Sequence, residues 1–439
     1  MSSEISQRVA PGSWLPPAVW RLEMSALAFA AALGASAPVQ AAVPCTNGPT
    51  FNLTTATGNI STPDGNSVFM WSYRNAAGAA FQVPSPVLCV TQGQTVTINL
   101  INTALPEPTS IVFPGQTGVG TIGGSPGLFT SEIGPGPGTV TYRFVANEPG
   151  TYLYESGTNP HKQVEMGLYG VLIVRPSVAS NRAYTDPDTL FDTSQQYLLL
   201  IHDIDPFLHQ AVERGQTYDI TAKHDRYWTI NGRSFPDTIL PNNDPLLPEQ
   251  PYGALVTVDE VPCATPGSGA GCTPAGGVAN RPALVRYANA GLSNHPFHPH
   301  GNHLRVIARD GRLLAGPGGA GIPAIAAMEA FTKTIGSGQT YDLLVRWINE
   351  QEFDPTLNTV PVVIPGLQNL VFKDDVTVYS GSPYLGFQDE LPPAVVSSND
   401  CGELYYPWHS HALNEFNNFD EGFGGLATLF RVEPTGGCP

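Results

Sequence analysis

Six of the ten histidines lie in two short segments, HPFHPHGNH at 295–303 and WHSH at 408–411. Side chains on a β-strand alternate between faces with a period of two, so each HxH pair places both imidazoles on one face. The two pairs are His298 with His300 and His409 with His411. Two such strands lying side by side would direct four imidazoles at one point, an arrangement that suits copper or zinc.

A single HxH is often a surface pair or a hydrogen-bonded pair with no metal. Two such pairs in aromatic, Pro-rich frames favour a metal site instead. The Irving–Williams order favours Cu(II), with zinc as the competitor, and an open coordination position would admit water or a small substrate. The chain has no HExxH motif and no phosphate-binding Gly-Lys motif.

The segments around the histidines are typical of short strands separated by turns. The 439 residues include 46 Gly and 42 Pro, and only 13% are charged, which argues against a long-helix or coiled-coil protein. Runs such as TVTYRF (139–144), LYGVLIVRP (168–176) and ALVRYANAG (283–291) are rich in β-branched and aromatic residues. The sequence therefore predicts an all-β protein, with AIAAMEAF (324–331) as its one short helix.

Length and composition predict two β-sandwich domains. We expect the first at residues 43–180, a polar linker at 181–196, and the second at 197–439 with long loops. Splitting the second domain near residue 350 is the alternative, and it is weaker because too few strands remain for another sandwich.

Residues 1–42 have the pattern of an export signal. Arg8 and Arg21 precede an apolar run at 24–35, and small residues follow at Val39 and Ala41. The run is shorter than the roughly 20 residues of a membrane span, although an uncleaved anchor is the alternative reading. We expect a periplasmic or secreted protein without a membrane span.

Six cysteines agree with an oxidising compartment. Of the pairings open to six cysteines, we favour the sequential one, because each bond then closes within one domain. Its bonds would be Cys45–Cys89, Cys263–Cys272 and Cys401–Cys438. The net charge of −17, without a basic stripe, argues against a nucleic-acid partner.

Several motifs resemble those of multicopper oxidases. HPFHPHGNH is similar to the family's HPFHLHGH, and YPWHSHALNEF (406–416) is similar to its C-terminal HCH segment. The resemblance extends to TSIVFPGQ (109–116), GTYLYESG (150–157), GLYGVLIVRP (167–176), INGRSFPD (230–237), ARDGRLL (308–314) and GQTYDLLV (338–345). It implies tandem cupredoxin-like Greek-key β-sandwich domains of the laccase and nitrite-reductase type, with copper as cofactor.

By this resemblance, His298 matches a type 2 copper ligand, and His300, His409 and His411 match ligands of the type 3 pair. The first domain departs from the family, because Val112, Phe113 and Pro114 replace TSIHWHG, and Glu155 to Gly157 replace the end of YHSH. With that half missing, one metal ion is a better expectation than a three-copper cluster. His161 is a candidate substitute ligand, although a solvated loop histidine is its plainer interpretation.

The blue copper site is also incomplete. Its cysteine position holds Ser410, whose hydroxyl cannot supply the thiolate that this centre needs. His295 matches the first ligand, Glu415 lies near the second, and Leu426 lies near the axial methionine. Ordinary laccase activity, which passes electrons through that cysteine, is therefore not expected.

Other polar residues near these motifs have supporting roles at most. His303 would lie beside the four histidines, and Glu155 and Glu415 would accept hydrogen bonds from ligand imidazoles, or would simply be solvated. His202, His209 and His224 match no family ligand, and we interpret them as structural or surface residues.

Three functions fit these residues. The first is an exported oxidoreductase with a residual mononuclear copper site. The alternatives are a non-catalytic periplasmic metal-binding protein and a structural or adhesive β-sandwich with relic histidines. Two-domain relatives hold metal between subunits, so the resemblance also implies a homo-oligomer, with a trimer as the expected form. The motifs specify neither the small-molecule substrate nor the electron donor.

Overall fold

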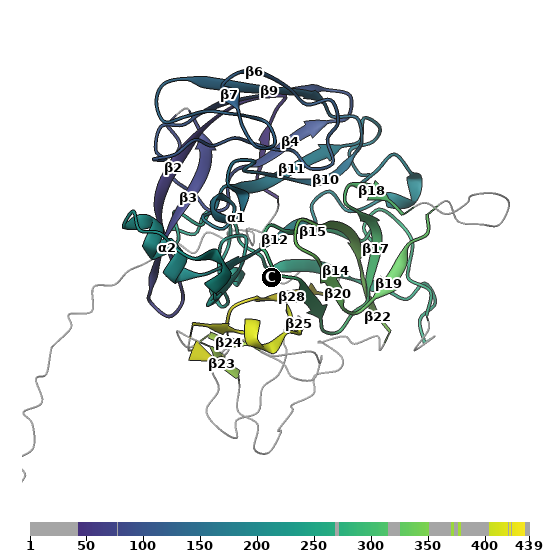
Figure 1. Ribbon diagram of the computed structural model, residues 1–439. Coiled ribbons are helices and arrows are strands. Elements are labelled where there is room, and N and C mark those ends of the chain that lie inside the picture. Colours follow the sequence, from purple (N-terminus) through teal and green to yellow (C-terminus); the bar gives the residue numbers. More distant parts are fainter. Residues whose placement is uncertain are drawn as a thin grey trace, which may run out of the picture. The chain divides into compact units, whose positions relative to one another are not determined.

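The computed structural model describes residues 43–434, with gaps at 77, 268–271, 315–324, 351–369, 373–375, 379–403, 420 and 423. Within this range the chain forms β-sheets with a few short helices, which confirms the all-β prediction (Figure 1). The predicted signal, residues 1–42, lies outside the described residues.

The first part of the chain, purple to blue in Figure 1, forms two sheets with strand orders β3-β2-β5-β9-β6 and β1-β4-β11-β10. A small hairpin, β7–β8, lies beside them in sequence. The strands are β1 (Cys45–Asn47), β2 (Thr50–Ser61), β3 (Ser67–Asn75), β4 (Val87–Thr91), β5 (Thr95–Ile101), β6 (Gly120–Gly123), β7 (Ser125–Pro126), β8 (Ser131–Glu132), β9 (Thr139–Val145), β10 (Gly150–Glu155) and β11 (Tyr169–Arg175).

Alternation of side chains builds the core of these sheets. In β5 the buried Val96, Ile98 and Leu100 alternate with more exposed residues, and β9 alternates in the same way. The apolar faces of both sheets contribute to one cluster, which includes Leu88 and Leu172 from the second sheet. This is the packing expected of a β-sandwich.

The later strands form two more sheets, ordered β13-β12-β15-β21-β17-β18, with β19 on β17, and β20-β16-β25-β28-β14-β22. The strands are β12 (Gln196–Ile204), β13 (Tyr227–Ile230), β14 (Val256–Pro262), β15 (Ala283–Asn289), β16 (His295–Pro299), β17 (Leu304–Arg309), β18 (Arg312–Leu313), β19 (Met328–Ala330), β20 (Lys333–Ile335), β21 (Thr340–Val345), β22 (Trp347–Asn349), β25 (Leu404–Ser410) and β28 (Ala427–Glu433). Two short hairpins are β23 (Leu370–Phe372) with β24 (Val376–Val378) and β26 (Asn417–Asn418) with β27 (Glu421–Gly422).

Strands β16 and β25 pair in antiparallel register at the centre of the second of these sheets. The pairing sets Phe297 opposite Ser410 and His298 opposite His409. Phe297 and Trp408 point into the core, where their rings stack at 6.1 Å and both contact Tyr287. The opposite face of the two strands is left for the histidines.

The helices are short, and none of them lies where the sequence predicts one. They are α1 (Pro160–Gln163), α2 (Pro206–Glu213) and the 3-10 turns η1 (Pro187–Thr189), η2 (Ile220–Ala222), η3 (Asp237–Ile239) and η5 (Leu413–Glu415). Helix α2 begins where the Asp205 carboxylate accepts hydrogen bonds from the backbone N–H groups of Phe207 and Leu208, with Pro206 at the first turn.

The helix predicted at 324–331 was wrong. Within it, Met328–Ala330 forms the strand β19, which pairs with Leu304–Val306 of β17. A short apolar run does not distinguish the two structures, and here an available strand edge decided the outcome.

The segment predicted as a linker, residues 181–196, is packed rather than free. Its Ala183, Tyr184 and Phe191 are buried in one cluster with Leu284 and Ile307. The Tyr184 hydroxyl also donates to Asp342 Oδ2 at 2.5 Å.

A buried polar junction joins β10 to the later sheets. The Thr151 hydroxyl donates to Asp342 Oδ1 at 2.5 Å, and Arg286 contacts both residues. The Thr340 hydroxyl donates to the backbone oxygen of Thr151 at 2.7 Å. Buried hydrogen bonds thus connect residues that are far apart in sequence.

Two of the predicted disulfides are confirmed, Cys45–Cys89 and Cys263–Cys272. The third pair, Cys401 with Cys438, falls outside the described residues. No helix in the described part of the chain has the length and apolar character to cross a membrane.

Candidate metal centre

The two HxH pairs meet on one face of the β16–β25 pair. His298 faces His409 across the strands, and the pairing continues beyond them. The backbone N–H of His300 donates to Pro407 O at 2.9 Å, and that of His411 donates to Pro296 O at 2.8 Å. The backbone register therefore brings all four imidazoles together.

The four rings contact one another directly. The His298 ring centroid lies 4.9 Å from that of His300, 5.7 Å from that of His409 and 5.4 Å from that of His411. The His300 and His409 rings are 5.1 Å apart, and the His409 and His411 rings are 6.1 Å apart.

Backbone carbonyls fix the orientation of two of the rings. His298 Nδ1 lies 2.8 Å from Phe331 O, and His409 Nδ1 lies 2.7 Å from Ser410 O. A carbonyl only accepts hydrogen bonds, so both Nδ1 atoms carry a proton, which leaves Nε2 as the ring nitrogen that could bind a metal. This pattern is common among metal-binding histidines.

The donor set fits copper or zinc, although it is not yet arranged around one point. His300 Nε2 and His409 Nε2 are 3.0 Å apart. At metal–nitrogen distances of about 2.0–2.1 Å, that spacing corresponds to an angle of about 95°, within the range of four-coordinate sites. In the described segments, no group of three or more His, Cys, Asp or Glu side chains is already arranged to hold a metal ion. The β16–β25 pairing nevertheless holds the rings close together.

Electrostatics favour the neutral form of two of these rings, His300 and His409. Burial, followed by the neighbouring imidazoles, lowers the pKa of His300. Burial also lowers the pKa of His409, with His298 and His411 adding to the effect, although the hydrogen bond to Ser410 opposes it. Neutral imidazole is the form that binds metal.

The cluster is open to solvent on one side. His409 is buried, His298 and His300 are half-buried, and His411 is exposed. Phe331, which is 59% exposed, lies edge-on to the His298 ring at 5.8 Å. The His303 ring also lies edge-on to Phe331, with the ring centroids 6.0 Å apart, so it belongs to the rim beside the cluster.

His295 occupies a different environment from the four histidines. Its ring is fully buried, with Nδ1 2.9 Å from Glu415 Oε2 and Nε2 3.1 Å from Asp203 Oδ1. Carboxylate oxygens accept only, so both ring nitrogens carry protons and the ring is an imidazolium. The Ser410 hydroxyl donates to the same Glu415 oxygen at 2.5 Å.

Further donors hold the Asp203 carboxylate. Its Oδ2 accepts from the backbone N–H groups of Leu292 and Ser293 at 3.1 and 3.2 Å, and Lys223 Nζ lies 3.6 Å away. Gly291 allows this approach, because a Cβ at that position would lie 1.6 Å from Asp203 Oδ1.

These contacts shift the pKa values of His295 and Asp203 so that the charged form of each is favoured. Burial alone would lower the pKa of His295, but its hydrogen bonds to Asp203 and Glu415 raise that pKa to about 9. Burial would likewise raise the pKa of Asp203, but the hydrogen bond and charge of His295, with the charge of Lys223, hold that pKa below its ordinary value.

The residues at the blue copper position therefore do not fit that metal. Ser410 provides no thiolate, and both nitrogens of His295 are engaged by carboxylates. Glu415 does accept a hydrogen bond from an imidazole, as expected of it, but the imidazole is that of His295.

In the first sheets, the positions of the missing ligands form ordinary backbone pairs. Val112 N donates to Glu155 O at 2.8 Å, and Glu155 N donates to Val112 O at 3.1 Å. Burial raises the pKa of the Glu155 carboxyl. The Phe113 side chain is buried in the core.

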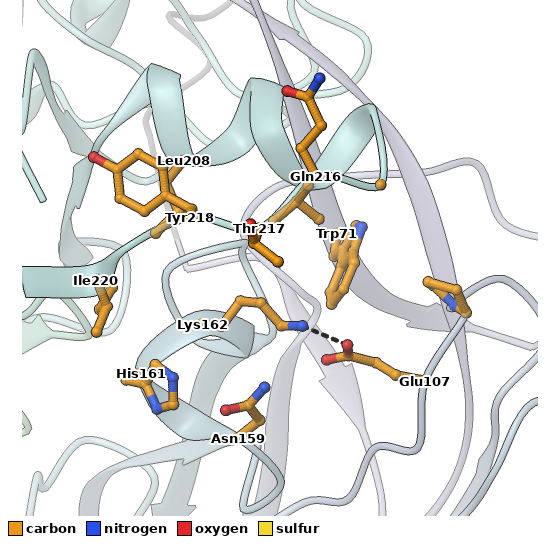
Figure 2. Close-up of a pocket in the computed structure, with 13 residues that line it drawn as sticks. Trp71, Glu107, Asn159, His161, Lys162, Leu208, Gln216, Thr217, Tyr218 and Ile220 are labelled. Atoms are coloured by element: carbon orange, nitrogen blue, oxygen red, sulfur yellow. Dashed lines mark hydrogen bonds and ion pairs between the residues drawn. The ribbon is translucent and has the colours of Figure 1, made fainter. Parts of the chain in front are cut away.

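His161 lines a pocket of about 400 Å³. Figure 2 shows it beside Asn159 and Lys162, with the Lys162 ammonium pointing to the Glu107 carboxylate. The other walls come from Trp71, Pro106, Leu208, Val212, Gly215, Gln216, Thr217, Tyr218 and Ile220. His161 thus belongs to the surroundings of α1 and α2, and the lining of its pocket includes none of the four clustered histidines.

Sequence reasoning missed Asp203 and Lys223. Asp203 acts on a histidine 92 residues away, and no local motif announces that contact. The neighbouring His202 and His209 are buried and bind backbone oxygens of Glu165 and Phe69, in keeping with a structural interpretation.

Comparison with known proteins agrees with the motifs. Residues 64–179 match the sequence model of the family described as multicopper oxidase. The iron transport multicopper oxidase fetC of Epichloe festucae is 29% identical over 164 residues, 37% of this chain and 25% of that protein. The L-ascorbate oxidase of Cucumis sativus is 30% identical over 137 residues, 31% of this chain and 21% of that protein. These alignments therefore span about a quarter or less of the relatives.

Solved structures share the fold over most of the chain. The blue copper oxidase from Nitrosomonas europaea superposes with a TM-score of 0.55 at 20% identity, covering 88% of this chain and 86% of its own. The multicopper oxidase mgLAC also gives 0.55, at 18% identity and the same coverage. The family match at residues 64–179, the two relatives and the shared cupredoxin-like fold together support the multicopper oxidase superfamily for this chain, which has Ser410 in place of the blue-copper cysteine and no histidine at positions 112–114 or 154–157.

Proposed function

We propose that this protein is an exported copper-binding oxidoreductase whose four histidines hold a single copper ion and which has no blue copper. The observation that carries the proposal is the meeting of His298, His300, His409 and His411 on one face, with two rings fixed by carbonyls. Zinc is the competing metal for such a donor set.

The protein's own residues set what such a site would do. When bound there, copper supplies a redox couple and a Lewis acid. Phe331 O and Ser410 O orient the rings of His298 and His409, and the exposed side of the cluster leaves room for a small molecule beside Phe331. Ser410 offers no thiolate path for electrons, so turnover would use a donor that reaches the four-histidine site directly.

A second candidate is a metal-binding protein without turnover. The hydroxyl of Ser410 favours it, because the usual electron entry is missing while the imidazoles remain. A structural sandwich with relic histidines is the third candidate, and it predicts that no metal binds at all.

The deciding experiment is elemental mass spectrometry of the purified protein beside the His298→Ala/His411→Ala variant. We expect about one copper per chain in the wild type, its loss in the variant, and no intense blue absorption. A His224→Ala variant is the control, because His224 lies outside the cluster.

Each outcome separates the candidates. Bound copper with oxidation of small reductants supports the oxidoreductase, and bound copper without any oxidation supports the metal-binding alternative. No metal in either protein, even after loading with copper and zinc, leaves only the structural sandwich.

Export and assembly belong to the same proposal. The disulfides Cys45–Cys89 and Cys263–Cys272 support an oxidising address. N-terminal sequencing of the mature protein should give a start after Ala41 or Ala42.

Light scattering with and without copper tests the homo-oligomer, for which we expect a trimer.

A further inference from the structure

We propose that the buried Asp203–His295–Glu415 ion cluster stands in for the blue copper as a structural link, and that it positions the His409–Ser410–His411 segment before any metal binds. The three residues are fully or almost fully buried. They belong to β12, β16 and the turn η5, so one imidazole connects two sheets and the segment that follows β25.

The cluster is internally satisfied, which a buried ion cluster must be if it is to be stable. Each nitrogen of His295 donates to one carboxylate. Asp203 also accepts from two backbone N–H groups and faces Lys223, and Glu415 also accepts from Ser410. No lone pair of the His295 ring is left for a metal ion.

Two contacts connect the cluster to the metal ligands. Ser410, whose hydroxyl binds Glu415, also accepts a hydrogen bond from Ala412 N at 3.2 Å, and it separates His409 from His411 in the chain. On the neighbouring strand, His295 and His298 belong to β16, which pairs with β25 at the level of Ser410. The carboxylates thus hold both strands from the face opposite the four imidazoles.

This inference makes Asp203, His295 and Glu415 positioning residues, and the part that concerns metal affinity rests on the proposed function. The part that concerns the ion cluster does not. The test therefore includes one measurement on the metal-free protein and one on metal binding.

The first measurement is nitrogen-detected NMR of histidine-labelled, metal-free protein at about pH 8, above the ordinary histidine pKa of about 6.5. We expect the His295 ring to carry protons on both nitrogens, and the His409 and His411 ring signals to shift in Glu415→Gln. A singly protonated His295 in the wild type, or unchanged His409 and His411 signals in the variant, would overturn the proposal whether or not metal binds.

The second measurement is a Cu(II) competition titration with electron paramagnetic resonance spectra for the wild type, Glu415→Gln and Ser410→Ala. We expect affinity to fall about tenfold or more and the copper spectrum to change, as for other residues that orient metal ligands. Glu213→Gln, which removes an exposed carboxylate on α2, is the matched control and should leave both unchanged.

The outcomes are distinguishable. If the variants melt earlier but keep the wild-type affinity and copper spectrum, the cluster is only a stabilising feature and the positioning role is wrong. If the wild type binds no copper, the proposed function fails, and the NMR result alone decides the cluster. Should Glu415→Gln not fold, Ser410→Ala, which keeps every charge, carries the test.

Discussion

His295 and His298 are three residues apart on one strand and meet opposite environments. An odd separation on a β-strand places side chains on opposite faces, so His295 points into the protein and His298 points to its open edge. The inner ring meets two carboxylates and becomes a cation, whereas the outer ring meets three imidazoles and stays available as a ligand. One short motif therefore yields two different kinds of histidine.

The charge on His295 predicts how stability depends on pH. Its pKa in the folded protein is raised to about 9, above the unfolded value of about 6.5. The ion cluster therefore contributes fully below about pH 6.5, and that contribution is lost as the pH rises through about 9. Denaturant unfolding across this range should show a loss of up to about 3 kcal/mol in the free energy of unfolding.

A His295→Gln variant provides the comparison for that measurement. Without the titrating ring, its free energy of unfolding should be lower at neutral pH and nearly flat between about pH 6.5 and 9. An equal slope in the variant would mean that other groups cause the pH dependence.

Restoring the missing cysteine should not restore a blue copper site. In Ser410→Cys the thiolate returns, but Asp203 and Glu415 still engage both nitrogens of His295. We expect copper-loaded Ser410→Cys to lack intense blue absorption in visible spectroscopy. A blue protein from this single change would contradict our account of His295.

The turn between β15 and β16 sets the position of the ion cluster. A Cβ on Gly291 would lie 1.6 Å from Asp203 Oδ1, so Gly291→Ala must displace that carboxylate. Breaking a buried ion pair typically costs about 3–5 kcal/mol, which we expect as the loss in chemical denaturation. Gly134→Ala is the control, because a Cβ there meets open space, and an equal loss there would refute the steric explanation.

Most strands could be predicted because their side chains alternate, as they do in β5 and β9. The helix α2 was missed because its Asp-Pro start follows directly on the apolar strand β12. The opposite error occurred at 324–331, where pairing with β17 outweighed local preference. Local sequence patterns thus predict strands well, but they do not distinguish a short helix from an edge strand.

The four-histidine cluster followed from two HxH pairs, because a period of two fixes the face of each side chain. The ion cluster could not be predicted as a unit. The sequence predicts Glu415 either as an acceptor for an imidazole or as a solvated residue, and Asp203 reaches His295 only through the packing of two sheets. Sequence periodicity carries no information about such contacts between sheets.

The junction around Asp342 makes the first and later sheets depend on each other. Asp342 accepts from Thr151 and Tyr184 and pairs with Arg286, all of them buried. Asp342→Ala should cost about 3–5 kcal/mol and should lower the melting temperature of the whole chain in a single calorimetric transition. Two separate transitions in the wild type would show that the sheets unfold independently. The control is Asp188→Ala, which removes an exposed carboxylate.

The pairing of β16 with β25 also has a consequence in time. His300 and His409 are in contact although 109 residues separate them in sequence. A ribosome working at about 5–20 residues per second therefore incorporates His300 roughly 5–20 seconds before His409. An unfinished chain exposes one HxH pair without its partner strand. The four-histidine cluster therefore forms only after β25 has been synthesised, and a chain that ends before β25 has only half of the cluster.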